Sequence, residues 1–254
     1  VGATALLMAE RPTPDAVFRR LTEGPKERRP RIFYAVPTLY AAMLASPAFP
    51  KKEDLALRVC ASAGEALPAE ILKRFTERTG VDILDGIGST EMLHIFISNR
   101  PGDVKPGSTG KPVPGYAVRV LDEHGNEVEQ GELGELQISG PTSAVMYWNS
   151  REKTKNTFQG PWNGSGDKYS VDADGYYLYG GRSDDMLKVG GIYVSPVEVE
   201  AALISHPAVL ECAVVGAEDA DKLVKPKAFV VLKAGAQASD EELKAHVKSR
   251  LAAY

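Results

Sequence analysis

The stretch from Asp85 to His94, DGIGSTEMLH, places two glycines just before a hydroxyl and a carboxylate. Gly86 and Gly88 carry no side chain, so their backbone amides can come close to an anion such as a phosphate. Thr90 adds a hydroxyl for a phosphate oxygen, and Glu91 adds a hard carboxylate oxygen of the kind that Mg²⁺ binds beside substrate phosphates. The stretch therefore indicates a magnesium–phosphate site, and the alternative is an ordinary glycine-rich turn with a solvated glutamate.

A second glycine turn, SAGEAL at 62–67, has the same context, because both turns directly follow a predicted strand. Between the two strands, helical spacing that begins at Pro68 and stops at Gly80 predicts a helix. Alternating strands and helices indicate a mostly parallel sheet, whose ligands bind beyond the carboxyl ends of the strands. Both turns should therefore lie at one edge of the sheet. Strands are expected at 31–37, 57–64 and 81–84, helices at 38–46 and 67–80, and a strand leading into a helix at 1–18.

After residue 103 the pattern changes to short alternating strands between Gly- and Pro-rich turns, which predicts antiparallel β structure. Two later helices begin at capping boxes, Ser195 with Glu198 and Ser239 with Glu242. The predicted fold class is α/β and α+β: part of a parallel-sheet α/β subdomain at 1–103, a small antiparallel β subdomain at 104–183, and an α+β domain at 184–254. Strands in the last two parts are expected at 116–122, 134–140, 175–180, 209–216 and 226–233.

Composition excludes several classes of protein. The chain has 254 residues and a net charge of −4, without the basic cluster that a nucleic-acid partner requires. No apolar run reaches membrane-spanning length, no signal peptide is visible, and no Cys/His spacing fits a zinc site. Cys60 and Cys212 each lie in an apolar strand pattern, which predicts buried, reduced thiols. Because the chain begins at Val1 within a strand pattern, we expect it to be a piece of a longer protein.

Five motifs, in this order, together resemble the adenylate-forming superfamily of acyl-CoA synthetases, firefly luciferase and peptide-synthetase adenylation domains. Within that superfamily, the first two motifs and RPTPDAVF at 11–18 look most like benzoate–CoA ligase and close aryl-CoA ligases. The resemblance covers essentially the whole chain and implies that residues 184–254 are a truncated lid domain. The five motifs are ASAGEALP at 61–68, DGIGSTEMLHIF at 85–96, GELGELQISG at 131–140, GSGD at 164–167 and DADGYYLYGGRSDDMLKVGG at 172–191.

The resemblance implies an ATP-dependent activation of an aromatic acid, with benzoate as the first expectation. The carboxylate attacks Mg-ATP to give an acyl-adenylate and pyrophosphate, and the thiol of coenzyme A then displaces AMP. It further implies a cytoplasmic enzyme of aromatic degradation, with ATP or AMP, Mg²⁺ and coenzyme A as cofactors, and it leaves open a homodimer of the whole protein. The alternatives are a 4-coumarate or fatty acyl-CoA ligase, a carrier-loading adenylation domain, and a nucleotide-binding piece without activity.

Within the resemblance, the turn of Gly64, Glu65 and Ala66 presses its backbone on the adenine. Thr90 binds the α-phosphate and Glu91 binds Mg²⁺, and these two are the expected catalytic residues. The remaining residues expected to bind the nucleotide or coenzyme A are Asp85, Gly86, Ile87, Gly88, Ser89, Asp167, Arg182 and Lys188.

The later residues of this set have separate roles in the resemblance. Asp167 accepts from both ribose hydroxyls, and Arg182 reaches the ribose or a phosphate as a fixed fork of donors. Asp184 matches the hinge between the large domain and the lid. Lys188 and the turn Gly190–Gly191 line the channel that delivers the coenzyme A thiol.

The aromatic acid is expected beside the same sheet edge, against Ala63, Gly88, His94 and Ile95. His94 could donate to the carboxylate, or it could be a hydrogen-bonded structural histidine. Two positions depart from the superfamily pattern. Ile87 stands where an aromatic residue usually stacks on the adenine, and Asp85 stands where Asn or Gln is common, although its carboxylate could accept from the adenine amino group.

Two motifs that suggest ligand sites are better explained as turns. PGSTGKPVPG at 106–115 lacks the Lys of a phosphate-binding loop and follows Thr90 instead of preceding it. Residues 167–175 lack the Asp/Asn spacing and the closing Glu of a calcium loop. By the resemblance, the true phosphate loop precedes Val1 and a catalytic lysine follows Tyr254. Because losing one such preorganised charge costs roughly 100- to 1000-fold, we expect this chain alone to be nearly inactive.

Overall fold

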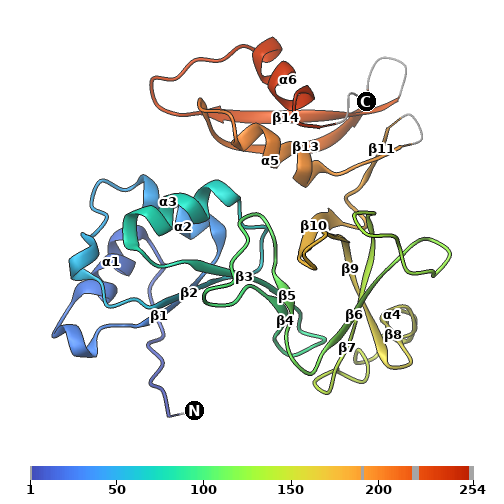
Figure 1. Ribbon diagram of the computed structural model, residues 1–254, viewed down its shortest axis with the longest axis horizontal. Helices are drawn as coiled ribbons and strands as arrows, with labels where there is room; N and C mark the ends of the chain where they lie inside the picture. Colours follow the sequence, from blue (N-terminus) through green and yellow to red (C-terminus); the bar gives the residue numbers. More distant parts are fainter. Residues whose placement is uncertain (1, 190–191, 219–222, 252–254) are drawn as a thin grey trace. The chain divides into compact units, whose positions relative to one another are not determined.

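The computed structural model describes residues 2–189, 192–218 and 223–251. The chain divides into two compact units, Val1–Pro114 and Gly115–Tyr254, and most of their helices and strands are labelled in Figure 1. No helix in the described part of the chain combines the length and the apolar character needed to cross a lipid bilayer.

The first unit is built on a five-stranded sheet in the order β1-β2-β3-β4-β5. β1 (Ile32–Ala35), β2 (Val59–Ser62) and β3 (Ile83–Gly88) are parallel, as the sequence predicts. β4 (Ile95–Ser98) and β5 (Lys111–Pro112) then add antiparallel pairs that were not predicted. β5 was missed because a two-residue strand that contains proline has no alternating pattern to detect.

Three helices belong to this unit: α1 (Pro14–Thr22) precedes β1, while α2 (Pro37–Ala45) connects β1 to β2 and α3 (Ala69–Thr79) connects β2 to β3. Pro68 stands at the N-cap of α3, and Gly80 ends the helix in the left-handed conformation with φ +74°, which glycine adopts without steric cost. Two single 3₁₀ turns lie at Lys26–Arg28 and Lys52–Asp54. The strand predicted before α1 is wrong, because residues 2–9 pair with none of the described strands and Leu7 is 88% exposed.

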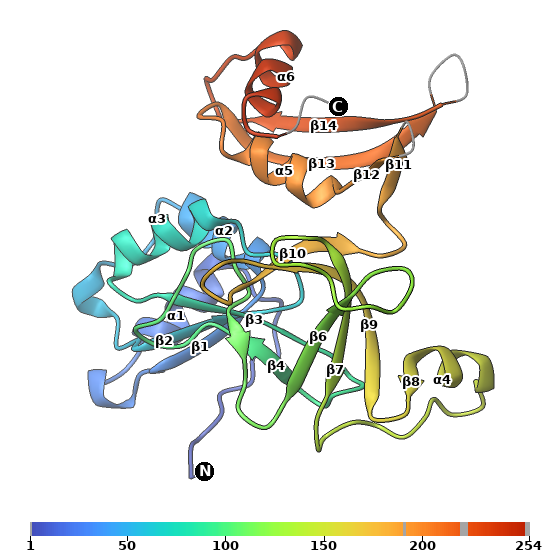
Figure 2. The same cartoon turned by 45° about the vertical axis from the view of Figure 1, so that its right-hand side comes forward.

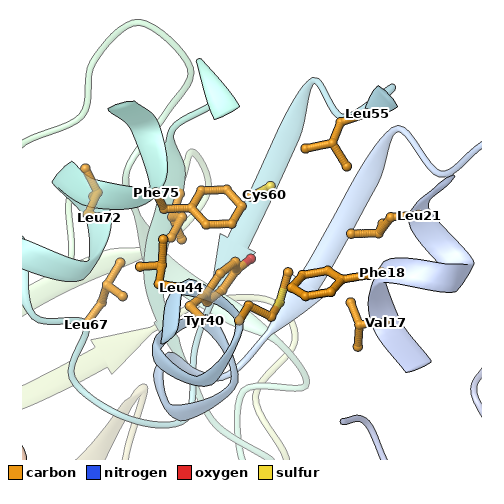
Figure 3. Packing of buried hydrophobic residues seen from close by; sticks show 12 residues of the cluster. Val17, Phe18, Leu21, Tyr40, Leu44, Leu55, Cys60, Leu67, Leu72 and Phe75 are labelled. Atoms are coloured by element: carbon orange, nitrogen blue, oxygen red, sulfur yellow. The ribbon is translucent and has the colours of Figure 1, made fainter. Parts of the chain in front are cut away.

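The core of the first unit lies between these helices and the sheet (Figure 3). Tyr40 from α2 and Phe75 from α3 meet edge to face, with ring centroids 5.1 Å apart. The Tyr40 hydroxyl donates to the Ala61 carbonyl oxygen at 3.0 Å, so the buried phenol is satisfied. Cys60 is fully buried, and burial raises the pKa of its thiol to about 12. This cysteine is therefore an inert core residue, as predicted.

The second unit contains a sheet in the order β10-β9-β7-β6, drawn in Figure 2. β6 (Ala117–Leu121), β7 (Gly134–Ser139) and β10 (Tyr177–Arg182) match the predicted strands. The longest strand of the sheet, β9 (Trp162–Val171), was not predicted, and neither were α4 (Arg151–Thr157) and β8 (Phe158–Gln159). β9 escaped prediction because the Gly-Ser-Gly run at 164–166 interrupts its alternation, and Gly166 has φ +73°.

The rest of the second unit consists of two pairs of antiparallel strands and two helices. β11 (Leu187–Val189) pairs with β12 (Ile192–Val194), and β13 (Val209–Glu218) pairs with β14 (Val224–Leu232). α5 (Pro196–Ile204) and α6 (Asp240–Lys248) begin at the predicted caps, since the Ser195 and Ser239 hydroxyls accept from the amides three residues later. Ser195 also donates to the Gly180 carbonyl oxygen at 2.6 Å, which ties α5 to β10.

Candidate functional site

The two glycine turns of the first unit lie at the same edge of the sheet, as predicted. Ser62 at the end of β2 is the register partner of Asp85 on the neighbouring parallel strand β3. β3 continues through Gly88, because Gly86 and Ile87 pair with Ser98 and Ile97 of β4. The DGIG segment is therefore part of a strand, a correction to the loop that the sequence suggested. Its backbone is held by two neighbours before the turn begins.

Asp85 and Ser62 are the polar residues buried deepest at this edge, with 7% and 1% of their surfaces exposed. Neither Asp85 Oδ1 nor Ser62 Oγ has a hydrogen-bond partner among the described residues. Burial raises the pKa of the Asp85 carboxyl to about 8, and only a bond from the Gly86 amide opposes the rise. Unsatisfied buried polar atoms are costly in a folded protein, so a pair of them at a sheet edge indicates a site that a ligand completes.

The turn between β3 and β4 is anchored by Met92, whose side chain is fully buried. The Met92 amide donates to the Ser89 hydroxyl oxygen at 3.2 Å, and the Leu93 amide donates to the Thr90 carbonyl oxygen at 3.3 Å. Leu93 has φ 73°, an unusual conformation for a branched residue, and its side chain is 72% exposed. This arrangement leaves Thr90 exposed and Glu91 half-buried.

Gly88 is required where the turn closes. A Cβ atom at this position would lie 2.5 Å from the His94 carbonyl oxygen and 2.8 Å from the Ile95 amide. His94 is exposed and Ile95 is half-buried. The His94 ring nitrogen Nδ1 lies 2.7 Å from the Ile95 carbonyl oxygen. The backbone of His94 is thus held in place by its close approach to Gly88, and its ring is held by the contact with the Ile95 carbonyl oxygen.

The turn after β2 is more open. Gly64 has φ +92°, and a Cβ atom there would approach only Val36, at 3.8 Å. Glu65 and Ala66 are exposed, and Ala63 is half-buried. The backbone conformation explains the glycine, and the exposure leaves the peptide groups of this turn accessible to a flat ligand.

Thr90 and Glu91 offer a donor set that fits one Mg²⁺ ion. Magnesium in nucleotide sites is usually held by one or two carboxylates together with substrate phosphates and water. Glu91 is half-buried beside the exposed Thr90, and the described residues hold no cluster of three or more His, Cys, Asp or Glu that could bind a metal alone. A metal here would therefore complete its shell with the phosphates of a ligand and neutralise their charge.

The second unit holds the other predicted pair. Asp167 on β9 and Arg182 on β10 are register partners, with Arg182 Nη1 3.2 Å from Asp167 Oδ1. The Asp167 amide donates to the Ser165 hydroxyl oxygen at 3.0 Å. Burial raises the pKa of Asp167, while the Arg182 guanidinium and the Ser165 hydroxyl act to lower it. A Cβ atom on Gly166 would lie 2.9 Å from Arg182 Nη2, so the guanidinium packs on a bare backbone.

The remaining predicted residues lie after β10. Asp184 is exposed, and its Oδ1 lies 3.5 Å from Arg182 Nε. Lys188 is in β11, but its side chain, together with Gly190 and Gly191, lies outside the described residues. The structure therefore places Asp184 next to the Asp167–Arg182 pair and leaves the predicted thiol channel as a prediction.

Sequence reasoning missed three residues around these sites. Ser62 lies just before the glycine turn, and its position at a strand end was the available signal. Glu135 accepts from the Ser183 hydroxyl and pairs with Lys168 Nζ at 3.0 Å, which braces both β9 and the segment after Arg182. The left-handed backbone of Leu93 has no signal in its residue type, since leucine rarely adopts it.

Comparison with known proteins assigns a family to both parts of the chain. Residues 1–148 match the model of the AMP-binding enzyme family, and residues 198–254 match the model of the AMP-binding enzyme C-terminal domain.

Individual relatives agree with this match. The chain is 66% identical to a benzoate–CoA ligase of Thauera aromatica, over 100% of this chain and 48% of the relative. It is 51% identical to a 4-hydroxybenzoate–CoA/benzoate–CoA ligase of Rhodopseudomonas palustris, over 99% and 47%. The crystal structure of a benzoate CoA ligase from Burkholderia xenovorans LB400 is 61% identical with a TM-score of 0.92, over 99% of this chain and 50% of that one. The chain spans about half the length of the curated relatives it matches.

Proposed function

Because this chain belongs to the AMP-binding enzyme family, we propose that the whole protein converts an aromatic carboxylic acid, benzoate first, into its coenzyme A thioester with ATP. The observation that supports this most is the turn that follows β3, because it carries the Thr90 hydroxyl and the Glu91 carboxylate after the strand that holds Asp85, whose Oδ1 has no hydrogen-bond partner among the described residues. A relative that is 66% identical and is named a benzoate–CoA ligase supports benzoate as the acid.

In the first step the acid carboxylate attacks the α-phosphorus of ATP and pyrophosphate leaves. The chain's own contribution is to position and to neutralise charge, which is where catalysis of phosphoryl-type displacements arises. Thr90 donates to an α-phosphate oxygen, and Glu91 holds the magnesium ion. Because Gly86 and Gly88 have no side chains, the nucleotide can lie directly against the backbone at the end of β3.

The nucleotide base and sugar have separate binding groups in this proposal. The peptide groups at Gly64, Glu65 and Ala66 lie against the adenine, and Asp85 accepts from its amino group. Asp167 accepts from the ribose hydroxyls while Arg182 holds that carboxylate and reaches toward a phosphate. The 3.2 Å pair of Asp167 and Arg182 supports this, because the pairing fixes the carboxylate before any ligand arrives.

The acid lies against Ala63, Gly88, His94 and Ile95, with Ile87 as an apolar neighbour of the adenine. After the first step, residues 184–254 rotate about Asp184. Coenzyme A then reaches the acyl-adenylate along Lys188, Gly190 and Gly191. The division of the chain at residues 103 and 183 belongs to the same proposal. Limited proteolysis that cuts near residue 184 in a ligand-dependent way would support the hinge.

Acid-dependent exchange of labelled pyrophosphate into ATP tests the first step on the whole protein. Exchange that needs benzoate and Mg²⁺ is expected, followed by benzoyl-CoA and AMP when coenzyme A is added. Exchange with a fatty acid or a 4-coumarate instead, or transfer only to a carrier protein, would favour another member of the superfamily. AMP binding without any exchange would leave a nucleotide-binding protein.

Three further expectations rest on the same function. Because ATP and coenzyme A are cytoplasmic metabolites, we place the whole protein in the cytoplasm, in the degradation of aromatic acids. A homodimer of the whole protein would give twice the monomer mass in light scattering. This chain alone should exchange pyrophosphate at least about 100-fold more slowly than the whole protein, as the loss of preorganised charges predicts.

A further inference from the structure

A buried hydrogen bond joins the start of α5 to β10. The Ser195 hydroxyl donates to the Gly180 carbonyl oxygen at 2.6 Å, and only 2% of the Ser195 surface is exposed. The same hydroxyl oxygen accepts from the Glu198 amide at 3.2 Å, which caps α5. One side chain therefore has two roles: it begins a helix, as capping serines do, and it binds a strand that lies earlier in the chain.

Gly180 can accept this bond because it stands outside the regular pairing of its strand. The register of β10 with β9 shifts between Tyr179 and Gly181, which leaves Gly180 as the extra residue of a bulge. A Cβ atom on Gly180 would overlap Leu133 Cδ1, and one on Gly181 would lie 3.6 Å from Val197 Cγ2. The two glycines thus leave a bare stretch of β10 on which the first turn of α5 packs.

The Ser195–Gly180 bond crosses the point about which the chain is proposed to rotate, since Gly180 precedes Asp184 and Ser195 follows it. The segment before that point is held in place, because the Ser183 hydroxyl donates to a Glu135 carboxylate oxygen. A rotation about Asp184 carries Ser195 away from Gly180 and must break their hydrogen bond. The bond can therefore exist in one arrangement of the residues after Asp184 and not in the other.

A contact shifts an equilibrium between two arrangements only by the difference in its strength between them. When the Ser195–Gly180 bond breaks by rotation, both groups can bind water instead, so its net contribution is modest. Removing the donor alone has a larger effect on the packed arrangement, because the buried Gly180 carbonyl oxygen then loses this donor without gaining water. The loss of the hydroxyl should therefore disfavour the packed arrangement by about tenfold.

We propose that Ser195 is a positioning residue that holds α5 on β10 in one of the two half-reactions, and that it thereby determines how the protein divides its time between forming the adenylate and forming the thioester. This inference rests on the proposed function and names a residue that controls the rotation in it. Ser195 acts through the arrangement of the chain and not on the reacting atoms.

The test measures the two half-reactions separately with the whole protein. The first is exchange of labelled pyrophosphate with ATP, Mg²⁺ and benzoate, and the second is single-turnover formation of benzoyl-CoA from added benzoyl-AMP and coenzyme A. Because each rate follows the population of its own arrangement, the ratio of the rates follows the ratio of the populations. In Ser195→Ala this ratio should change about tenfold, which corresponds to about 1.4 kcal/mol. A general loss of folded protein lowers both rates alike and leaves the ratio unchanged.

Two further variants separate the hydrogen bond to β10 from the cap of the helix. Ser239→Ala is the matched control, because Ser239 caps α6 in the same way, accepting from the Glu242 amide at 3.2 Å. It should lower stability without changing the ratio. Ser195→Gly also removes the hydroxyl, but glycine costs a helix cap much less than alanine does. Its ratio should therefore change as in Ser195→Ala, with a smaller loss of stability.

The outcomes separate the inference from the function beneath it. A wild-type ratio in Ser195→Ala, with both half-reactions present, would overturn the positioning role and leave the proposed function standing. An equal change in Ser239→Ala, or a wild-type ratio in Ser195→Gly, would assign the effect to helix capping and overturn the role in the same way. The absence of exchange and of benzoyl-CoA in the wild type would overturn the proposed function, and the positioning role with it.

Discussion

The two candidate ligand sites differ in how their polar groups are satisfied. In the first unit, Asp85 Oδ1 and Ser62 Oγ are buried without hydrogen-bond partners in the described part of the chain. In the second unit, Asp167 is paired with Arg182 at 3.2 Å, and its amide donates to Ser165. The first site is therefore incomplete without a ligand, while the second is already stable in itself. Changes in the first should affect activity and stability strongly, and changes in the second should affect mainly affinity.

Adding a methyl group at Gly88, where the turn of the first unit begins, should have the largest effect on stability and activity. Gly88→Ala places a Cβ atom 2.5 Å from the His94 carbonyl oxygen. Because the atoms it meets belong to the backbone of His94 and Ile95, they cannot move aside as a flexible side chain can. We expect the turn to move, with a stability loss on the order of 3 kcal/mol and pyrophosphate exchange reduced at least about 100-fold. Thermal unfolding and exchange assays on the whole protein measure the two effects.

The matched substitution in the second unit is Gly164→Ala. Nothing lies nearer than 4.0 Å to a Cβ atom at that position, and its φ is not left-handed. Its melting temperature should stay close to that of the wild type. Equal losses of stability in the two variants would contradict the contrast between a closed turn and an open strand.

Glu91→Gln removes the proposed magnesium ligand while keeping the side-chain shape. A lost metal ligand at a phosphoryl centre costs several kcal/mol of transition-state stabilisation, so exchange should fall about 100-fold or more. Glu123→Gln, in the exposed turn after β6, is the control and should retain full exchange. Raising the Mg²⁺ concentration should partly restore Glu91→Gln, and full activity in that variant at ordinary Mg²⁺ would refute the assignment.

Asp85 predicts a specific dependence of stability on pH. Its pKa rises from 3.8 to about 8 on folding, so the folded state binds the proton more tightly than the unfolded state. The contribution to stability is therefore fully present below pH 4 and declines as the pH rises toward about 8, by at most about 1.4 kcal/mol per unit. Asp85→Asn should remove this slope and be the more stable form at pH 8.

Urea unfolding of the whole protein at pH 5 and pH 8 measures the slope. Asp174→Asn, in the exposed turn after β9, should keep the wild-type slope. If the wild type and Asp85→Asn respond to pH alike, the carboxyl is not the buried, unsatisfied group described here.

Arg182→Lys should have the smallest effect on stability. The Arg182 side chain is 48% exposed, and ion pairs of this kind contribute about 1 kcal/mol or less. Lysine keeps the charge but not the planar fork, so AMP affinity should fall by about tenfold in calorimetry. A large loss of thermal stability with unchanged AMP affinity would make this pair structural and reverse the contrast.

Much of this contrast could be predicted from the sequence, since glycines and strand ends are local signals. Pro68, Gly80, Ser195 and Ser239 marked helix ends correctly because capping depends on a few neighbouring residues. The shared edge of the two glycine turns followed from the parallel sheet. β9 could not be predicted, because its glycines are tolerated only through pairing with β7 and β10.

The energetic state of the site residues was less accessible from sequence. That Asp85 Oδ1 is buried without a hydrogen-bond partner among the described residues depends on strand register with Ser62 and on the cover of the sheet. The contact of the His94 ring nitrogen Nδ1 with the Ile95 carbonyl oxygen, at 2.7 Å, likewise depends on how the turn folds and has no signal in the residue types. Residue types suggested which groups belong to the site, and tertiary contacts determined how deeply Asp85 and Asp167 are buried and in which direction their pKa values shift.

The central claim is that these residues make an acyl-adenylate. Mass spectrometry of a reaction of the whole protein with ATP, Mg²⁺ and benzoate, with coenzyme A left out, tests it directly. The account predicts benzoyl-AMP in an amount close to that of the protein, formed only when the acid is present. Consumption of ATP without any adenylate, or no consumption at all under conditions where AMP binds, would contradict it.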